Sequence, residues 1–405
     1  MGKSGVISSD LKRLWTAVFF LFLGFGVYAA CSANFATEII KIWPMGIGML
    51  EAVRELPGFL CVLVAALTMR IVEPILGAIA LCMVAVGVGA YATVHGVPSL
   101  LVWSFVWSVG LHTWMPISSS LTISLAGEHD KGKRLGQTAG IGSVGSVLGM
   151  LAVAHIGHGL AYRHWFIIAG ALIALAAIML LTLRRNIGHS DRPRMVWKPQ
   201  FRRYYLLSML EGGRKQVFFT FAPYTLTKVF GAPLKVMAAL MVINGIVGII
   251  GAPLVGHLID RIRERRILLV SYSCLIVVFL LYGTIHRAPE VFGMRVGYVF
   301  PMLCVLFCLD NLLYLSTACL TTYVQRIAEP EDLLPTLSMG VTMNHTAAVT
   351  VPLIGGFLWS QFSYPIMFFA GGVVVILSLF VVAGMDRSTG SGCTGSEPTE
   401  SAVAV

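Results

Sequence analysis

Apolar stretches of about 20 residues, the length that a helix needs to cross a bilayer, recur along the whole chain. They restrict its fold more than any other feature, because irregular backbone cannot face lipid. The 405 residues are 57% hydrophobic and only 12% charged, whereas soluble domains carry about 25% charged residues. The sequence therefore predicts an all-α integral membrane protein with twelve transmembrane helices. We expect them at 14–33, 46–69, 75–95, 100–125, 136–156, 164–183, 204–227, 234–259, 267–285, 297–323, 334–359 and 365–385.

A polar, Arg-rich segment with two prolines divides the predicted helices into two sets of six. We expect residues 1–183 to form one six-helix bundle and residues 204–385 to form a second. The segment between them, 184–203, is predicted to be a basic cytoplasmic linker. The tail, 386–405, is rich in Gly, Ser and Thr and is predicted to be disordered and cytoplasmic.

The formal net charge of +10 is distributed unevenly among the predicted loops. If the N-terminus is cytoplasmic, most Lys and Arg residues fall in cytoplasmic segments, which is the positive-inside pattern. The charge thus indicates membrane orientation, with both termini in the cytoplasm, and not a nucleic-acid partner. We expect a multi-pass plasma membrane protein of the bacterial inner membrane, acting as a monomer.

The two predicted bundles share sequence features. The last helix of each contains a similar stretch, "FIIAG" at 166–170 and "FFAGG" at 368–372. Related six-helix halves recur in transporters, with the substrate site between them near the bilayer midplane. The stretch "GIGSVG" at 140–145 spells a dinucleotide-binding pattern, but it lacks the preceding strand that such a site requires. Gly145 and Gly149 instead predict a surface of small residues for helix packing.

The segment between the eighth and ninth predicted helices carries the most specific motif. It reads "GHLIDRIRERR" at 256–266 and is similar to the Gly-x-Leu-x-Asp-Arg-x-x-Arg-Arg signature of the major facilitator superfamily, with one extra residue before the final arginines. "PLIGG" at 352–356 also resembles the eleventh helix of that family. The chain as a whole resembles this superfamily. The resemblance implies two pseudo-symmetric six-helix bundles and a secondary transporter that works by alternating access.

On this resemblance, Gly256, Asp260 and Arg261 form a cytoplasmic gate motif. Gly256 would permit close helix packing, and Asp260 would pair with arginines or face a helix N-terminus. In the first half only Leu67 and Arg70 match the motif, so the second half is expected to supply most of the gate.

Charged residues within the seventh predicted helix need an explanation. Glu211, Arg214 and Lys215 are spaced i, i+3 and i+4 and share one helix face. Lys215 would lie roughly 18 Å along the helix, close to the midplane. A charge there costs at least about 2.5–3.5 kcal/mol unless it is paired or faces water, so such residues are functional candidates.

The second predicted helix repeats this spacing with Glu51, Arg54 and Glu55. The first-half cluster has a net charge of −1 and the second-half cluster a net charge of +1. Each can bind substrate or protons. Alternatively, each is a self-paired structural cluster, or together they form an outer gate between the halves.

The resemblance implies that the first, fourth, seventh and tenth helices line a central cavity. Further lining candidates therefore come from these helices, and two asparagines and a histidine of the eighth and eleventh helices are secondary candidates. The lining candidates beyond the seventh-helix cluster are Tyr28, His112, Trp114, Asp310, Asn311 and Tyr314, and the secondary ones are Asn244, Asn344 and His345.

These residues lead to the hypothesis of proton-coupled symport of a small organic anion such as a carboxylate. Arg214, Lys215 and Arg54 would bind the anion, because guanidinium and ammonium groups recognise carboxylates. Tyr28, His112, Asn311 and Tyr314 would complete the substrate site. Glu211, Glu55 and Asp310 are the candidates for proton coupling.

Other functions are possible on the same fold. The main alternative is proton-driven efflux of lipophilic or cationic compounds, and a minor one is a transport-inactive sensor or assembly partner. No arrangement of residues predicts an enzyme, a cofactor or a metal site. His155, His158 and His164 form an outer-rim group for which metal entry is conceivable, but polar rim histidines explain it more simply.

Overall fold

The computed structural model describes residues 8–60, 71–127, 130–157, 159–185, 187 and 197–385. The described residues are almost all helical, and they contain no strand. Ten helices in this part of the chain are long and apolar enough to cross a membrane. Helices α2 (Pro44–Phe59) and α8 (Arg202–Lys228) complete the twelve predicted spans. Helix α2 is short, and the residues that follow it, 61–70, are not among those described. The charged residues of α8 lower its mean hydropathy.

The first half contains six spans. Besides α2, they are α1 (Ser9–Asn34, extended by the π-helix η1, Phe35–Ile39), α4 (Glu73–Gly89, followed by η2, Ala90–Thr93), α5 (Val97–Leu125), α6 (Lys131–Ile156) and α7 (Tyr162–Leu181). The bounds of five agree with the predicted ones within about six residues, and the predicted end of the second span, at residue 69, lies outside the described residues.

The second half follows the same order of spans. Besides α8, they are α9 (Leu234–Arg261), α10 (Glu264–Thr284, followed by η4, Ile285–Arg287), α12 (Val299–Tyr314) together with α13 (Ala318–Ile327), α14 (Pro330–Gln361) and α15 (Pro365–Ala383). The short helices α11 (Ala288–Phe292) and η5 (Val296–Tyr298) lie between α10 and α12, and η6 (Leu315–Thr317) lies between α12 and α13.

The predicted span 297–323 is divided into α12 and α13 by the 3₁₀ turn η6. The Ser316 hydroxyl donates to the Leu313 carbonyl at 2.7 Å, and the Thr317 hydroxyl donates to the Tyr314 carbonyl at 2.8 Å. Side-chain bonds to the preceding turn compete with the regular α-helical pattern, which accounts for the tightened turn.

Small residues let helices approach closely within the first half. The α6 glycines Gly145 and Gly149 pack on the α1 backbone at Phe19 and Leu23, which confirms the small-residue surface predicted for this helix. Helix α1 also packs on α7, and α4 packs on α5 and α7. In the second half α14 and α15 pack on α8, and α10 packs on α15.

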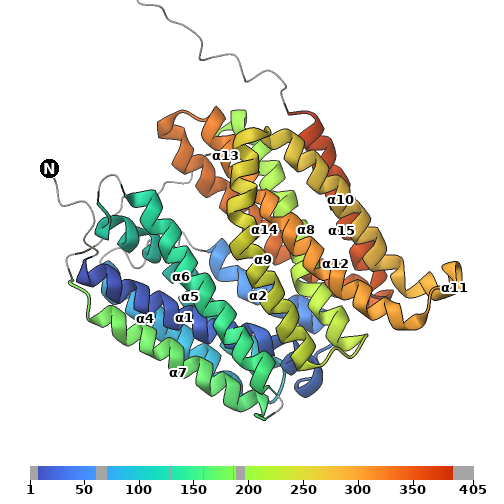
Figure 1. The fold of residues 1–405 in the computed structure, drawn as a ribbon, viewed down its shortest axis with the longest axis horizontal. Coiled ribbons are helices and arrows are strands. Elements are labelled where there is room, and N and C mark those ends of the chain that lie inside the picture. Colours follow the sequence, from blue (N-terminus) through green and yellow to red (C-terminus); the bar gives the residue numbers. More distant parts are fainter. Residues whose placement is uncertain are drawn as a thin grey trace, which may run out of the picture.

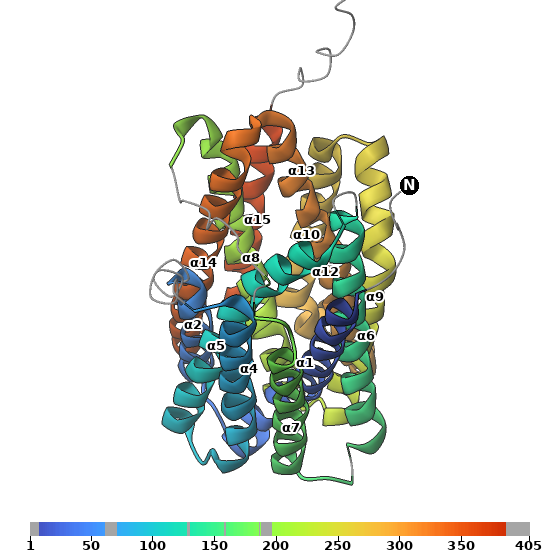
Figure 2. The same cartoon turned by 90° about the vertical axis from the view of Figure 1, so that its left-hand side faces the viewer.

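The two halves meet mainly where α2 packs on α14 and where α6 packs on α9. In Figure 1 their helices converge at the lower middle of the picture and diverge toward the side where α1 begins and α15 ends. Figure 2 shows the first half in front, with α1, α4, α5 and α7 side by side. Glycines form the α2–α14 contact, because Gly48 lies on the Pro352 backbone and Gly356 on the Pro44 backbone.

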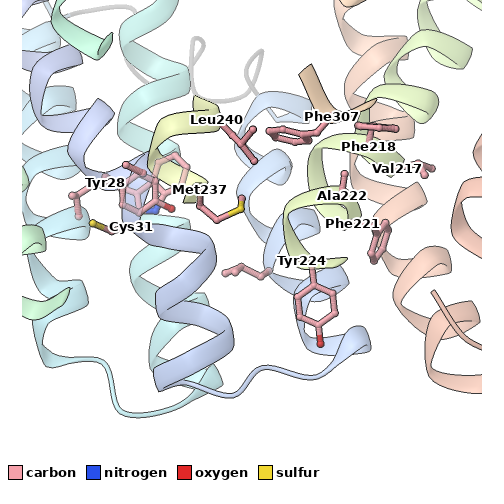
Figure 3. Close-up of a cluster of buried hydrophobic side chains, with 14 of the residues drawn as sticks. Tyr28, Cys31, Val217, Phe218, Phe221, Ala222, Tyr224, Met237, Leu240 and Phe307 are labelled. Atoms are coloured by element: carbon pink, nitrogen blue, oxygen red, sulfur yellow. The ribbon is translucent and has the colours of Figure 1, made fainter. Parts of the chain in front are cut away.

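A layer of buried apolar side chains lies near the end where the halves converge. Figure 3 shows it between α1 and the second half, with Met237 and Leu240 of α9 extending toward it. Tyr28 and Cys31 contribute from α1, and Phe307 contributes from α12. This layer excludes water from the converging end.

Two loops seal that end by reciprocal hydrogen bonds. The Asn34 side-chain amide, at the end of α1, donates to the Ala232 carbonyl at 2.8 Å. The Tyr224 hydroxyl, near the end of α8, donates to the Ile42 carbonyl at 2.9 Å. Ile42 follows Asn34 by the same number of residues as Ala232 follows Tyr224, so equivalent positions of the two halves have the same roles, the first as donor and the second as acceptor.

The backbone of the two loops is also alike. Each turns through one residue of positive φ, Lys41 at 55° and Gly231 at 64°. The following residue donates back to the helix, from Ile42 to the Ala36 carbonyl and from Ala232 to the Leu226 carbonyl, both at 2.9 Å. Such helix ends favour glycine, and Lys41 adopts the same turn without it.

The predicted linker 184–203 is described only in part, and the predicted tail 386–405 lies outside the described residues. Their roles therefore remain predictions, and so do the boundaries assigned to the two bundles.

Candidate functional site

The candidate site lies where α2 and α5 of the first half face α8, α12 and α14 of the second. Glu55 of α2 and His345 of α14 connect the halves, since the imidazole Nδ1 lies 2.9 Å from a Glu55 carboxylate oxygen. His112 of α5 stands beside them, with its ring centroid 5.3 Å from that of His345. All three side chains are partly exposed. Two predicted site residues and one secondary candidate thus meet at the interface.

Arg214 lies within a buried group of acidic side chains in the second half. It forms a short ion pair with Glu211 on the preceding helical turn, and its Nη1 lies 3.5 Å from Asp310 of α12. Tyr272 of α10 donates to the second Glu211 oxygen at 3.1 Å. The Arg214 guanidinium also lies 5.5 Å from the Tyr314 ring centroid. With no exposed surface, Arg214 is not accessible to a ligand in this conformation.

Arg54 lies within a different group in the first half. It pairs with Glu51, and it donates to the hydroxyls of Tyr28 at 2.6 Å and Tyr91 at 3.1 Å. The guanidinium also lies 5.5 Å from the Trp107 ring centroid, within the range of a cation–π contact. The two tyrosine hydroxyls lie 3.3 Å apart. This group therefore holds one acid, one base and an aromatic shell.

Lys215 is the third cation of the predicted site, and its surroundings differ from those of both arginines. Its ammonium lies 5.6 Å from the Phe219 ring centroid and 5.7 Å from that of Tyr314. It interacts electrostatically with Glu55 and His112 across the interface. Within the described part of the chain no salt bridge holds it. The side chain is partly exposed.

The remaining lining candidates have structural contacts. Asn311 donates to the Asn244 carbonyl of α9 at 3.2 Å, and Asn344 donates to the Ser208 carbonyl of α8 at 3.2 Å. Trp114 is buried in the first half, where Gly77 of α4 leaves room for it. These residues hold helices together in this conformation.

Comparison with known proteins identifies the family. The family profile described as Major Facilitator Superfamily matches residues 14–300 and 204–402. The chain belongs to this superfamily. It is a multi-span membrane transporter and not an enzyme, as the sequence predicted. No curated protein matches its sequence.

Solved structures share the superfamily fold. A point mutant of the nucleoside transporter NupG superposes with a TM-score of 0.74 at 15% identity, covering 93% of this chain and 99% of that one. A bacterial homolog of the human lysosomal transporter Spinster, inward-facing and unoccupied, gives 0.68 at 14% identity, covering 94% and 96%. A D-xylose-proton symporter gives 0.67 at 13% identity, covering 94% and 98%. At these identities the likeness shows the fold alone.

The superfamily motif between α9 and α10 differs from its predicted packing. Around Gly256 no atom lies within 4 Å of the position a Cβ would take, so this glycine does not support close helix contact here. Asp260 and Arg261 are exposed. The buried acid is Glu264 instead, which lies on the first turn of α10 and pairs with Arg326 of α13. The gate role of the motif remains a prediction.

Sequence reasoning missed several partners within the site of this superfamily member. Tyr91 and Tyr272, which hydrogen-bond to Arg54 and Glu211, were not among the candidates. His345 was only a secondary candidate, although it contacts Glu55 directly. Its position in the middle of an apolar helix was the available signal. No local pattern connects it to a residue of the second span.

Proposed function

We propose that this transporter couples protons to the movement of a small organic anion by alternating access. The observation that carries the proposal is the state of Lys215. It is a partly exposed cation at the interface of the halves, held by no salt bridge in the described residues. The related folds include transporters of a nucleoside and of xylose with a proton, which supports transport of a small polar solute.

Lys215 would be the main anion-binding group. Both arginines predicted for this role already have acidic partners, Arg54 with Glu51 and Arg214 with Glu211 and Asp310. An ammonium within a membrane protein needs a counterion or water. A substrate carboxylate supplies one through a charge-assisted hydrogen bond. The exposed face of Phe219, next to Lys215, offers apolar contact for the rest of the anion.

Asp310 would take up the coupled proton. Glu211 and Asp310 share a single guanidinium, so the buried group of Glu211, Arg214 and Asp310 holds one more acid than base. Asp310 has the longer contact, and its Oδ1 has no hydrogen-bond partner. The Tyr314 ring contacts both Arg214 and Lys215 and so connects this group to the anion site. Protonation of Asp310 would remove a negative charge near Lys215 and so favour binding of the anion.

The conformation would be open to the cytoplasm. The helices diverge on the side where α1 begins and α15 ends, and the positive-inside pattern assigns that side to the cytoplasm. The plasma membrane, in a bacterium the inner membrane, is the proposed location.

Thermal stability of the purified protein with a panel of carboxylates, sugars and lipophilic cations tests the proposal. A ligand at about 100 times its Kd adds roughly 2.7 kcal/mol to the state that it binds. We expect a carboxylate to stabilise the protein. Lys215→Ala should abolish that shift and Lys215→Arg should keep part of it. Lys235→Ala, which removes an exposed lysine of α9, is the matched control.

Flux measurements complete the test. We expect Lys215→Ala to stop carboxylate uptake into vesicles while the folded protein remains in the membrane. Normal carboxylate flux in Lys215→Ala would overturn the assignment. Stabilisation by lipophilic cations alone would overturn the anion substrate in favour of the efflux function.

A further inference from the structure

Glu55, His112 and His345 come from three helices and meet at the interface of the halves. One ligand atom from each, a carboxylate oxygen or an imidazole nitrogen, lies within 4.8 Å of the other two. We propose that these three residues bind a divalent transition-metal ion of the Zn²⁺ class, and that the bound ion holds the two halves in this conformation. The inference is independent of the proposed anion substrate.

The ligand set suits such an ion. Two imidazoles and one carboxylate are a common three-residue zinc set, which leaves a fourth position for water. Imidazole also binds Co²⁺ and Ni²⁺, whereas Mg²⁺ and Ca²⁺ prefer oxygen ligands alone. The site is therefore expected to discriminate between these two groups of ions.

A hydrogen bond already orients one imidazole for metal binding, and the other lies directly beside the carboxylate. The Nδ1 of His112 lies 3.0 Å from the Ser108 carbonyl, which can only accept, so Nδ1 carries the proton and Nε2 keeps a free lone pair. A histidine ligand is typically fixed through its other nitrogen by a carbonyl or carboxylate in this way. The Nδ1 of His345 lies 2.9 Å from a Glu55 carboxylate oxygen, and an ion bound by these two atoms would replace the proton that they share.

A glycine lets the rings come together. A Cβ at Gly58 of α2 would lie 2.5 Å from His345 Cε1 and 2.7 Å from His112 Cδ2, too close for either ring to stay in place. Ser108 fixes the other side, because its hydroxyl donates to the Arg54 carbonyl and so connects α5 to α2. The backbone of α2 thus sets the separation of the two imidazoles.

Lys215 opposes the metal ion, since its charge acts on both Glu55 and His112. Removing this charge should raise metal affinity by about tenfold. The same change should weaken binding of an organic anion. Lys215→Met should therefore raise the affinity for the metal ion and lower the affinity for the anion. Failure of the metal site and failure of the proposed function can thus be told apart.

The ligands belong to both halves, so a bound ion should restrict the movement of one half relative to the other. Glu55 and His112 belong to the first half and His345 to the second. Alternating access requires the halves to rock against each other. A metal ion bound by all three residues should therefore inhibit transport.

Titration of the purified full-length protein with CoCl₂ and ZnCl₂ tests the site. Co²⁺ bound by two imidazoles and a carboxylate should give visible absorption bands, and Zn²⁺ should displace it and raise the melting temperature. Both signals should disappear in His112→Gln and, separately, in His345→Gln. The double variant His155→Gln, His164→Gln removes exposed rim histidines and should keep both signals.

Two further variants guard against a trivial loss of structure. Gly58→Ala keeps all three ligands, and we expect it to weaken Co²⁺ binding at least about tenfold by displacing the rings. Lys215→Met should strengthen binding. Wild-type protein without Co²⁺ bands, or bands that persist in both His→Gln variants, would overturn the proposal. MgCl₂ producing the same stabilisation as ZnCl₂ would also overturn it.

Discussion

The charged groups around Arg54 and Arg214 have the same helical spacing but different partners. Arg54 pairs with Glu51 and then bonds to two tyrosine hydroxyls, so its group is neutral. Arg214 pairs with Glu211 and then meets a second acid, Asp310, so its group carries one excess acid. The Arg54 side chain is 13% exposed, whereas that of Arg214 is 0% exposed.

This difference supports a structural role for the Arg54 group and the proposed proton-binding role for the Arg214 group. An ion pair of one acid and one base is already neutral, so binding a proton would leave it with an uncompensated positive charge. A buried group with two acids and one base can accept a proton and become neutral. The third charged residue of each cluster leaves its group and faces the interface, Glu55 toward His345 and Lys215 toward Tyr314.

Removing the two arginines gives the largest expected contrast. Arg214→Met leaves two carboxylates in the interior without a counterion, and breaking a buried pair costs about 3–5 kcal/mol. Arg54→Met leaves one partly exposed acid and should cost less. Chemical denaturation or thermal unfolding of both variants in the same detergent measures the difference. An equal loss of stability would show that the second acid does not matter.

Asp310→Asn should separate transport from the proton gradient. A gradient of one pH unit is worth about 1.4 kcal/mol, enough for about tenfold accumulation of a substrate moved with one proton. We expect the variant to lose this accumulation and to retain exchange of substrate across the membrane. Vesicle uptake with and without a pH gradient measures both quantities. Glu51→Gln is the matched change in the first half, and gradient-driven uptake should survive it.

Tyrosine hydroxyls should contribute the smallest effects. Tyr272→Phe removes one donor to Glu211, and Tyr28→Phe removes one acceptor from Arg54. Hydrogen bonds to charged groups contribute about 1.5–3 kcal/mol. We expect Tyr272→Phe to cost more, because Glu211 is more deeply buried than Arg54. Thermal unfolding of the two variants compares them, and a larger loss in Tyr28→Phe would reverse the ranking.

The spans and the pairs within one helix could be predicted because their signals are local. Hydropathy fixes a span within its own 20 residues or so. Spacing of i and i+3 on one helix predicted that Glu51 could neutralise Arg54 and that Glu211 could neutralise Arg214. This self-pairing was the structural alternative to substrate binding. The assignment of both arginines to the substrate remains a prediction, and the structure favours Lys215.

Contacts between helices could not be predicted in the same way. Asp310 meets Arg214, and His345 meets Glu55, only because distant spans pack together in three dimensions. Gly256 matches a family motif, but no atom of another described helix lies within 4 Å of the position that its Cβ would take. A motif is a local pattern, so it does not specify which residues of other helices its members contact.

The seal at the converging end has a consequence for sequence divergence. Both of its acceptors are main-chain carbonyls, at Ile42 and Ala232, and every amino acid provides that group. Only the two donors, Asn34 and Tyr224, depend on side-chain identity. The two loops of the seal, one between α1 and α2 and the other between α8 and α9, can therefore accumulate substitutions without losing these hydrogen bonds. Each loop only has to keep its length and its turn.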